Sequence, residues 1–133
     1  MMGTNRFQHV DIRVTDLAAA KAFYSKLMPA LGFPIESGSV FTCYAAEGDP
    51  PQQPWFGFVE DKSHRPNINR ISFWAESRER VDEIASLLAA AGALNISGPR
   101  ACPEYTPSYY AVFFEDPFGN RLEICHLTDE RPE

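Results

Sequence analysis

The stretch YYAVFFEDPFGNRLEICH, residues 109–126, predicts two strands joined by the tight turn DPFG, with proline at the second turn position. The second of these strands carries a carboxylate, Glu123, between Leu122 and Ile124. Side chains alternate between the two faces of a strand, so Leu122 and Ile124 point to one face and Glu123 points to the other. The stretch therefore raises the question of whether Glu123 faces water, a salt bridge or a binding site.

The same succession of elements occurs twice along the chain, at a period of about 60 residues. In each copy an alternating strand precedes an amphipathic helix, and three further strands follow the helix. The first copy comprises a strand at 7–14, a helix capped by Thr15 or Asp16 and ended by Gly32, and strands at 34–38, 39–46 and 54–60. The second comprises a strand at 68–75, a helix between Ser77 and Gly92, and strands at 94–97, 109–115 and 120–126.

Bulk composition predicts one soluble domain over residues 1–133, with one module at about 6–62 and a second at about 67–127. Hydrophobic residues make up 44% of the chain, which is enough to fill a core. The net charge of -6 and the lack of a basic cluster argue against nucleic acid or a membrane as partner. Without a long apolar run or signal pattern, we expect a cytoplasmic protein. Its three cysteines resemble neither a disulfide framework nor a zinc knuckle.

Each module has one helix, which covers only one face of a small sheet. We therefore predict an α+β fold in which tandem βαβββ modules form a curved, cup-like mixed sheet with the helices on its outer face. Charged and aromatic side chains that face the cup are candidates for a binding site. By strand alternation these are His9, Asp11, Arg13, Trp55, Gly57, Arg70, Ser72, Trp74, Glu123 and Cys125.

The tandem modules, the segment HVDIRVTDLAAAKAFYSKLMPALGF and the ending FFEDPFGNRLEICH resemble the vicinal oxygen chelate superfamily over about residues 6 to 127. This superfamily includes glyoxalase I, extradiol dioxygenases and the fosfomycin- and bleomycin-resistance proteins. The segment GPRACPEYTPSYYAVFFEDPFGN is similar to an uncharacterised glyoxalase-like subgroup. The resemblance implies a small-molecule site in the cup and a homodimer. It is also consistent with a metal-dependent lyase, isomerase or dioxygenase.

The resemblance further implies a metal site whose ligands, His or Gln, Glu, His and Glu, come from four strands. His9 matches the first ligand position and Glu123 the last, whereas Gly57 and Arg70 stand at the second and third. A guanidinium group does not ligate a cation and repels it. Two possibilities therefore stay open, a divalent ion (Zn, Ni, Mn or Fe) held by His9 and Glu123, and no metal.

Three functions follow as alternatives. A metal-dependent enzyme would use His9 and Glu123 as ligands. In a metal-free enzyme, His9 and Glu123 would be the catalytic residues, and one of them would move a proton. A resistance-type protein would bind its ligand without chemistry. In each case Arg70 is an anchor for an anionic ligand or an ion-pair partner of Glu123, with Arg13 as another such partner. The other ligand-binding candidates are Arg13, Trp55, Trp74 and Tyr109.

Overall fold

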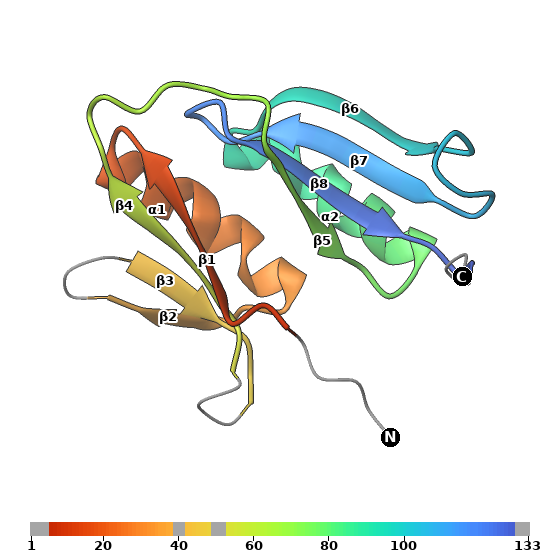
Figure 1. The fold of residues 1–133 in the computed structure, drawn as a ribbon, viewed down its shortest axis with the longest axis horizontal. Helices are drawn as coiled ribbons and strands as arrows, with labels where there is room; N and C mark the ends of the chain where they lie inside the picture. Colours follow the sequence, from red (N-terminus) through yellow and green to blue (C-terminus); the bar gives the residue numbers. More distant parts are fainter. Residues whose placement is uncertain (1–5, 39–41, 49–52, 130–133) are drawn as a thin grey trace. The chain divides into compact units, whose positions relative to one another are not determined.

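The computed structural model describes residues 6–38, 42–48 and 53–129. The chain divides into two compact units, residues 1–64 and 65–133 (Figure 1). Each unit contains a four-stranded mixed sheet and one α-helix, so the predicted α+β fold with two βαβββ modules is confirmed. Within the described residues, no helix is both long and apolar enough to cross a membrane.

The first unit has its sheet strands in the order β1-β4-β3-β2, with β1 parallel to β4 and the other neighbours antiparallel. Residues 39–41 of the predicted third strand lie outside the described residues. The elements are β1 (His9–Val14), α1 (Leu17–Leu27), the short 3-10 helix η1 (Pro29–Leu31), β2 (Ile35–Ser37), β3 (Thr42–Ala45) and β4 (Trp55–Glu60).

Helix α1 begins at a double cap. The Asp16 carboxylate accepts a hydrogen bond of 3.0 Å from the backbone N–H of Ala19, as an N-cap residue does. The Glu60 carboxylate, at the end of β4, accepts another of 3.0 Å from the backbone N–H of Leu17. Of the two predicted caps, Asp16 is therefore the one used, and Glu60 is already engaged at the helix terminus.

The second unit repeats the arrangement with the strand order β5-β8-β7-β6, and β5 is parallel to β8. The predicted caps Ser77 and Gly92 both lie at the ends of its helix. Helix α2 packs on β6, β7 and β8. The elements are β5 (Arg70–Trp74), α2 (Arg78–Ala91), β6 (Leu94–Ala101), β7 (Tyr110–Glu115) and β8 (Arg121–His126).

The alternation in β8 is confirmed. Leu122 and Ile124 are fully buried on the face that carries the core. The turn that leads into this strand is held by Asp116, whose carboxylate accepts hydrogen bonds of 2.9 Å from the backbone N–H groups of Phe118 and Asn120. The opposite face of the sheet, away from this core, carries the candidate site.

Candidate functional site

The face of the second sheet opposite the core is organised in three rows that run across the strands. The first row contains Glu115, Arg121 and Arg70, which are register partners on β7, β8 and β5. The second contains Ser97, Phe113, Glu123 and Ser72, and the third contains Arg100, Ala111, Cys125 and Trp74. Four of the predicted site residues therefore share one face of one unit, namely Arg70, Trp74, Glu123 and, just before β7, Tyr109.

Glu123 does not face water, and among the described residues it forms no salt bridge. Glu123 is only 5% exposed, and its carboxylate accepts a short hydrogen bond from the Tyr109 hydroxyl. A buried carboxylate needs such a partner because its removal from water is costly. Burial, followed by the hydrogen bonds to Glu123 and Cys125, raises the pKa of the Tyr109 phenol. The pair is thus a neutral donor and a buried acceptor.

Of the two roles left open for Arg70, the ion pair with Glu123 is not formed among the described residues. Arg70 lies in the first row, opposite Arg121, whereas the residue opposite Glu123 on β5 is Ser72. The Arg70 guanidinium carbon instead lies 4.9 Å from the centre of the Phe113 ring, in a cation–π contact. Tyr109 supplies the hydrogen bond that the Glu123 carboxylate requires, so Arg70 is not needed as its partner.

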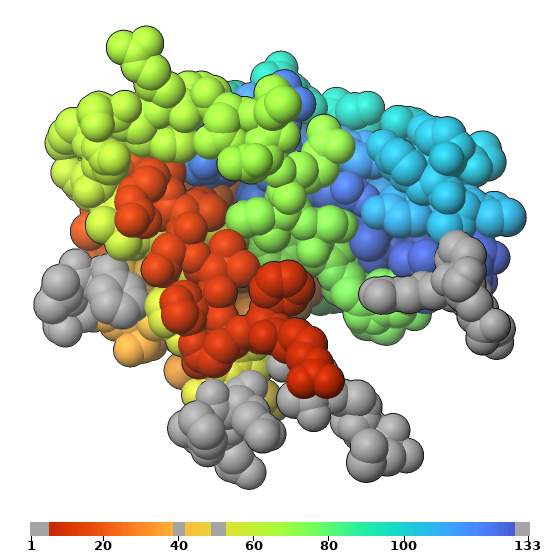
Figure 2. Space-filling model, in the orientation of Figure 1, coloured from red at the N-terminus to blue at the C-terminus, as the bar shows by residue number. Residues whose placement is uncertain are grey.

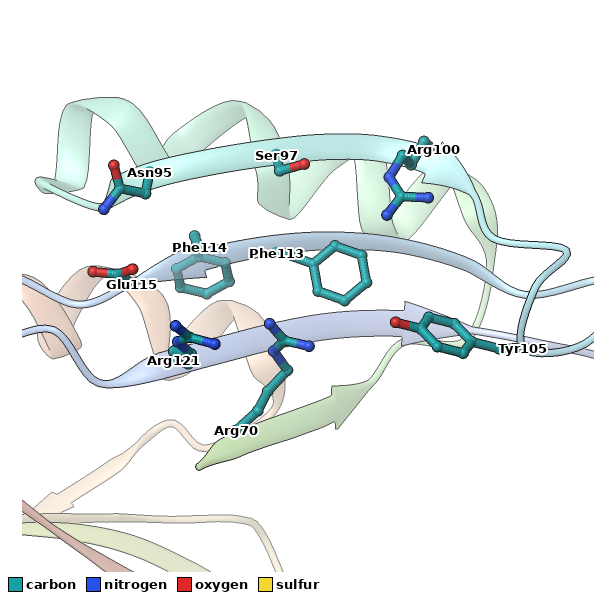
Figure 3. Close-up of a pocket in the computed structure, with 9 residues that line it drawn as sticks. All are labelled: Arg70, Asn95, Ser97, Arg100, Tyr105, Phe113, Phe114, Glu115 and Arg121. Carbon is teal, nitrogen blue, oxygen red and sulfur yellow. The ribbon is translucent and has the colours of Figure 1, made fainter. Parts of the chain in front are cut away.

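A cavity of about 280 Å³ opens at the first two rows (Figure 3). Its lining contains three arginines and one carboxylate, that of Glu115, so the walls carry an excess of positive charge. Asn95, Ser97 and Arg100 come from β6, Phe113, Phe114 and Glu115 from β7, Arg121 from β8, Arg70 from β5, and Tyr105 from the segment between β6 and β7.

The three arginines of this cavity differ in their partners. Arg100 forms an ion pair of 3.2 Å with Glu104 and lies 5.4 Å from the Phe113 ring centre. Arg70 and Arg121 have no carboxylate within 4.0 Å among the residues that the structure describes. In the first row Arg121 stands between Arg70, which repels it, and Glu115, which attracts it, so the three side chains together carry one net positive charge that an anion would balance.

Arg121, Arg100 and Phe113 were not among the predicted site residues. Arg121 could have been found, because it stands two residues before Glu123 on the same strand and so shares its face. Arg100 could not, because the predicted strand ended at residue 97 whereas β6 continues to Ala101. Strand β6 continues through Gly98 and Pro99, because proline is tolerated on an edge strand such as this one.

Trp74 lies in the third row and is 56% exposed. Its ring centre is 5.0 Å from that of His126, whose Nδ1 lies 2.8 Å from the carbonyl oxygen of Ala75. Trp74 therefore offers a free aromatic surface beside the cavity without being part of its lining.

The first unit carries the other predicted site residues on the open side of β1 and β4. The His9 and Trp55 rings stack with centres 4.1 Å apart and planes 3° from parallel. His9 Nδ1 lies 2.5 Å from the Gln8 side-chain oxygen, and its Nε2 lies 4.0 Å from an Asp11 carboxylate oxygen. Arg13 lies on the same exposed face of β1. The structure thus brings His9, Trp55 and Arg13 to one sheet face within this unit.

The donors present do not fit the implied metal site. A side chain at position 57 would place its Cβ 2.8 Å from a Trp55 ring carbon and 3.3 Å from the Thr42 carbonyl oxygen, so no ligand fits there without a shift. Position 70 carries a guanidinium group, which cannot act as a metal ligand. Within either unit, the described residues contain no group of three or more His, Cys, Asp or Glu side chains suited to a metal ion.

The duplicated unit places the chain in the class of α+β proteins built from two βαβββ modules. A family model for the Glyoxalase/Bleomycin resistance protein/Dioxygenase superfamily matches residues 6–124, and the chain belongs to this superfamily. YqjT, an uncharacterised protein of Bacillus subtilis strain 168, is 28% identical over 127 residues, which cover 87% of this chain and 94% of YqjT.

Solved structures agree with this assignment. A putative glyoxalase from Bacillus halodurans is 30% identical, with a TM-score of 0.67 over 91% of this chain and 95% of its own. A glyoxalase/bleomycin resistance protein from Albidiferax ferrireducens T118 is 24% identical, with a TM-score of 0.75 over 92% of this chain and 99% of its own.

Other structures of the same fold have named ligands or functions. A mutant of the fosfomycin resistance protein FosX from Listeria monocytogenes, 22% identical with a TM-score of 0.62, was solved with Mn(II) and 1S,2S-dihydroxypropylphosphonic acid; the match covers 89% of this chain and 86% of that one. TnmS3 from Streptomyces sp. CB03234, 20% identical with a TM-score of 0.64, is an antibiotic binding protein, and the match covers 96% of this chain and all of that one. These likenesses show a shared fold, which carries both resistance and binding functions.

Proposed function

We propose that this protein binds a small anionic molecule on the open face of the second sheet, with Arg70 and Arg121 as its anchors. The observation that carries the proposal is the cavity of about 280 Å³ with three arginines and one carboxylate in its lining. The planar fork of a guanidinium group matches a carboxylate, phosphate or phosphonate in two parallel hydrogen bonds. An anion of this kind would also relieve the repulsion between Arg70 and Arg121.

Aromatic side chains favour a ligand that also has a flat or apolar part. Phe113 forms the floor between Arg70 and Arg100, and Tyr105, which is 53% exposed, lines one end of the cavity. Trp74 offers another exposed ring in the third row of the same face. Trp55 and Arg13 remain ligand-binding candidates on the sheet of the first unit, considered by itself.

Binding without chemistry is the function that the geometry supports best, because the donors do not fit a divalent ion. A metal-dependent lyase, isomerase or dioxygenase with His9 and Glu123 as ligands is less well supported for the same reason. The mutant of FosX was solved with Mn(II), so a metal titration is a necessary part of any test.

A second candidate is metal-free catalysis on the bound anion. The observation that favours it is the buried Glu123 carboxylate with its Tyr109 partner, one row away from Arg70 on the same face. In this function Glu123 would move a proton, and Arg70 would stabilise negative charge that develops on the substrate. Turnover that survives metal removal and is lost in Glu123→Gln would distinguish it from binding alone.

The proposal is tested by calorimetric titration of the full chain, first passed over chelating resin, with methylphosphonate and acetate. Phosphonates are a rational first probe because the FosX structure holds one. We expect binding by the wild type and at least about tenfold weaker binding by Arg70→Gln, since hydrogen bonds to charged groups contribute about 1.5–3 kcal/mol.

The matched control is Arg65→Gln, which removes the same charge from an exposed residue of the same unit outside the cavity lining. We expect this variant to bind as the wild type does. Equal weakening by both substitutions would reduce the effect to net charge, and no heat of binding with either anion would contradict the proposal.

A further inference from the structure

A second cavity, of about 160 Å³, adjoins the arginine-lined one. Glu115 and Arg121 line both cavities, so the two cavities are neighbours that share these side chains. The remaining lining of the second cavity comes from Pro66, Asn67, Ile68 and Gly119.

From this arrangement we infer that the ligand carries an apolar arm, which occupies the second cavity while Arg70 and Arg121 hold its oxyanion. The inference rests on the proposed anion site and specifies the class of ligand as an organic phosphonate, phosphate ester or carboxylate with an aliphatic or aromatic substituent.

The second cavity has the character that such an arm requires. Ile68 is 81% exposed, and the other residues of the segment 65–70, which is green in Figure 2, are exposed as well. A single exposed isoleucine is ordinary on a protein surface. Here, however, Ile68 lines the second cavity, which neighbours the arginine-lined one, so a ligand that filled both cavities would cover this side chain.

One wall of the second cavity is fixed by a close backbone contact. A Cβ atom on Gly119, whose φ is +84°, would lie 2.5 Å and 2.7 Å from the Cγ and Cβ atoms of Pro66. Only glycine allows proline to approach so closely there, and it also adopts this φ without strain. Pro66 is thereby held against the turn that precedes β8.

Charge at the junction restricts what the arm contains. The Arg121 side chain has an aliphatic stem and a cationic head, so it borders an apolar group and an anion at once. The Glu115 carboxylate lines both cavities and repels a second negative charge. Arg70 lines only the first cavity, so the anion lies on the Arg70 side of this junction, and the arm that enters the second cavity beside the Glu115 carboxylate is uncharged.

The test is calorimetric titration of the metal-depleted full chain with methyl-, ethyl-, propyl- and butylphosphonate. Burial of one methylene strengthens binding by roughly fourfold, so we expect butylphosphonate to bind at least about tenfold more tightly than methylphosphonate. The variant Ile68→Ser should lose most of this gain and bind methylphosphonate as the wild type does. The control Ile96→Ser, at a residue outside both cavities and 39% exposed, should keep the gain.

The outcomes separate the two claims. If methylphosphonate did not bind, both the proposed phosphonate-binding site and the inferred apolar arm would be contradicted. Binding of methylphosphonate with no gain along the series would overturn the arm and leave the anion site intact. If Ile68→Ser kept the gain in affinity along the series, the alkyl group of the phosphonate would lie elsewhere, and the inferred arm would be overturned as well.

Discussion

At the scale of single residues, Glu123 and Tyr109 show how a charge is kept inside this fold. The carboxylate sits on the polar face of β8, between Phe113 and Ser72 of the neighbouring strands, and receives its hydrogen bond from a side chain just outside β7. A tyrosine hydroxyl satisfies the carboxylate without a second full charge, so the arginines nearby remain available to a ligand.

Tyr109→Phe removes this donor and leaves the buried carboxylate without it. We expect the free energy of unfolding to fall by about 1–3 kcal/mol, the usual cost of an unsatisfied buried polar group. Urea unfolding measures the change. The control is Tyr105→Phe, at an exposed residue whose ring contacts that of Tyr109, and it should have little effect. Equal stability of the two variants would show that the hydrogen bond contributes nothing.

The same pair also predicts a dependence on alkaline pH. Burial and the hydrogen bonds raise the pKa of Tyr109 above its usual value of 10.0, so the unfolded chain releases this proton first. The stability that the pair contributes is therefore present below about pH 10 and is lost as pH rises toward the folded-state pKa. Tyr109→Phe should show a shallower loss between pH 9 and pH 11 than the wild type.

In the first unit, Gly57 occupies a position with no room for a larger side chain. A Cβ atom there would press on the Trp55 ring and on the Thr42 carbonyl oxygen. We expect Gly57→Ala to destabilise the protein by about 1–3 kcal/mol, as overpacking does. Thermal or urea unfolding of Gly57→Ala, Trp55→Leu and the double variant gives the coupling between them. The double variant should recover part of the loss, and simple additivity of the two effects would contradict the proposed clash.

At the scale of elements, both α-helices begin with a side chain that accepts from the backbone three residues ahead. Asp16 accepts from Ala19, and Ser77 accepts from Arg80, each at 3.0 Å. Asp16→Ala should cost about 0.5–2 kcal/mol in urea unfolding, as loss of an N-cap does. Because Glu60 also caps α1, and among the described residues no second carboxylate accepts a hydrogen bond from a backbone N–H in the first turn of α2, Ser77→Ala should cost at least as much. A much larger loss at Asp16 would argue against the second cap.

The elements also show what the sequence could predict. The alternation in β1, β5 and β8 and the two helices with their caps follow from local patterns, so the order of elements and the polar face with Arg70, Trp74 and Glu123 were predictable. The partner of Glu123 was not. Which side chain reaches it depends on register between strands far apart in sequence, and this register places Ser72 opposite Glu123 and Arg121 opposite Arg70.

The arginine-lined cavity could not be predicted from the sequence either, for a related reason. It needs Arg100, which lies on the part of β6 beyond Gly98 and Pro99, outside the predicted strand 94–97. The pairing of β6 with β7 contains two register shifts, and no simple alternation rule places Arg100 opposite Ala111.

At the scale of the whole molecule, the chain repeats one module and uses its two open faces differently. The first carries a stacked His9–Trp55 pair beside Asp11, and the second carries an arginine-lined cavity beside a buried carboxylate. Membership of the superfamily accounts for the duplicated fold. Positions 57 and 70, a glycine with no room for a Cβ atom and an arginine, do not supply the second and third ligands that the family resemblance implies.

NMR titration of the metal-depleted protein with methylphosphonate shows whether Arg70 and Arg121 hold an anion. We expect saturable shifts of the side-chain Nε–Hε signals of Arg70 and Arg121, with smaller shifts at Phe113 beneath them. We also expect that binding does not require addition of Zn²⁺ or Mn²⁺. Shifts confined to other arginines, or binding only in the presence of a divalent ion, would contradict the proposed anion site.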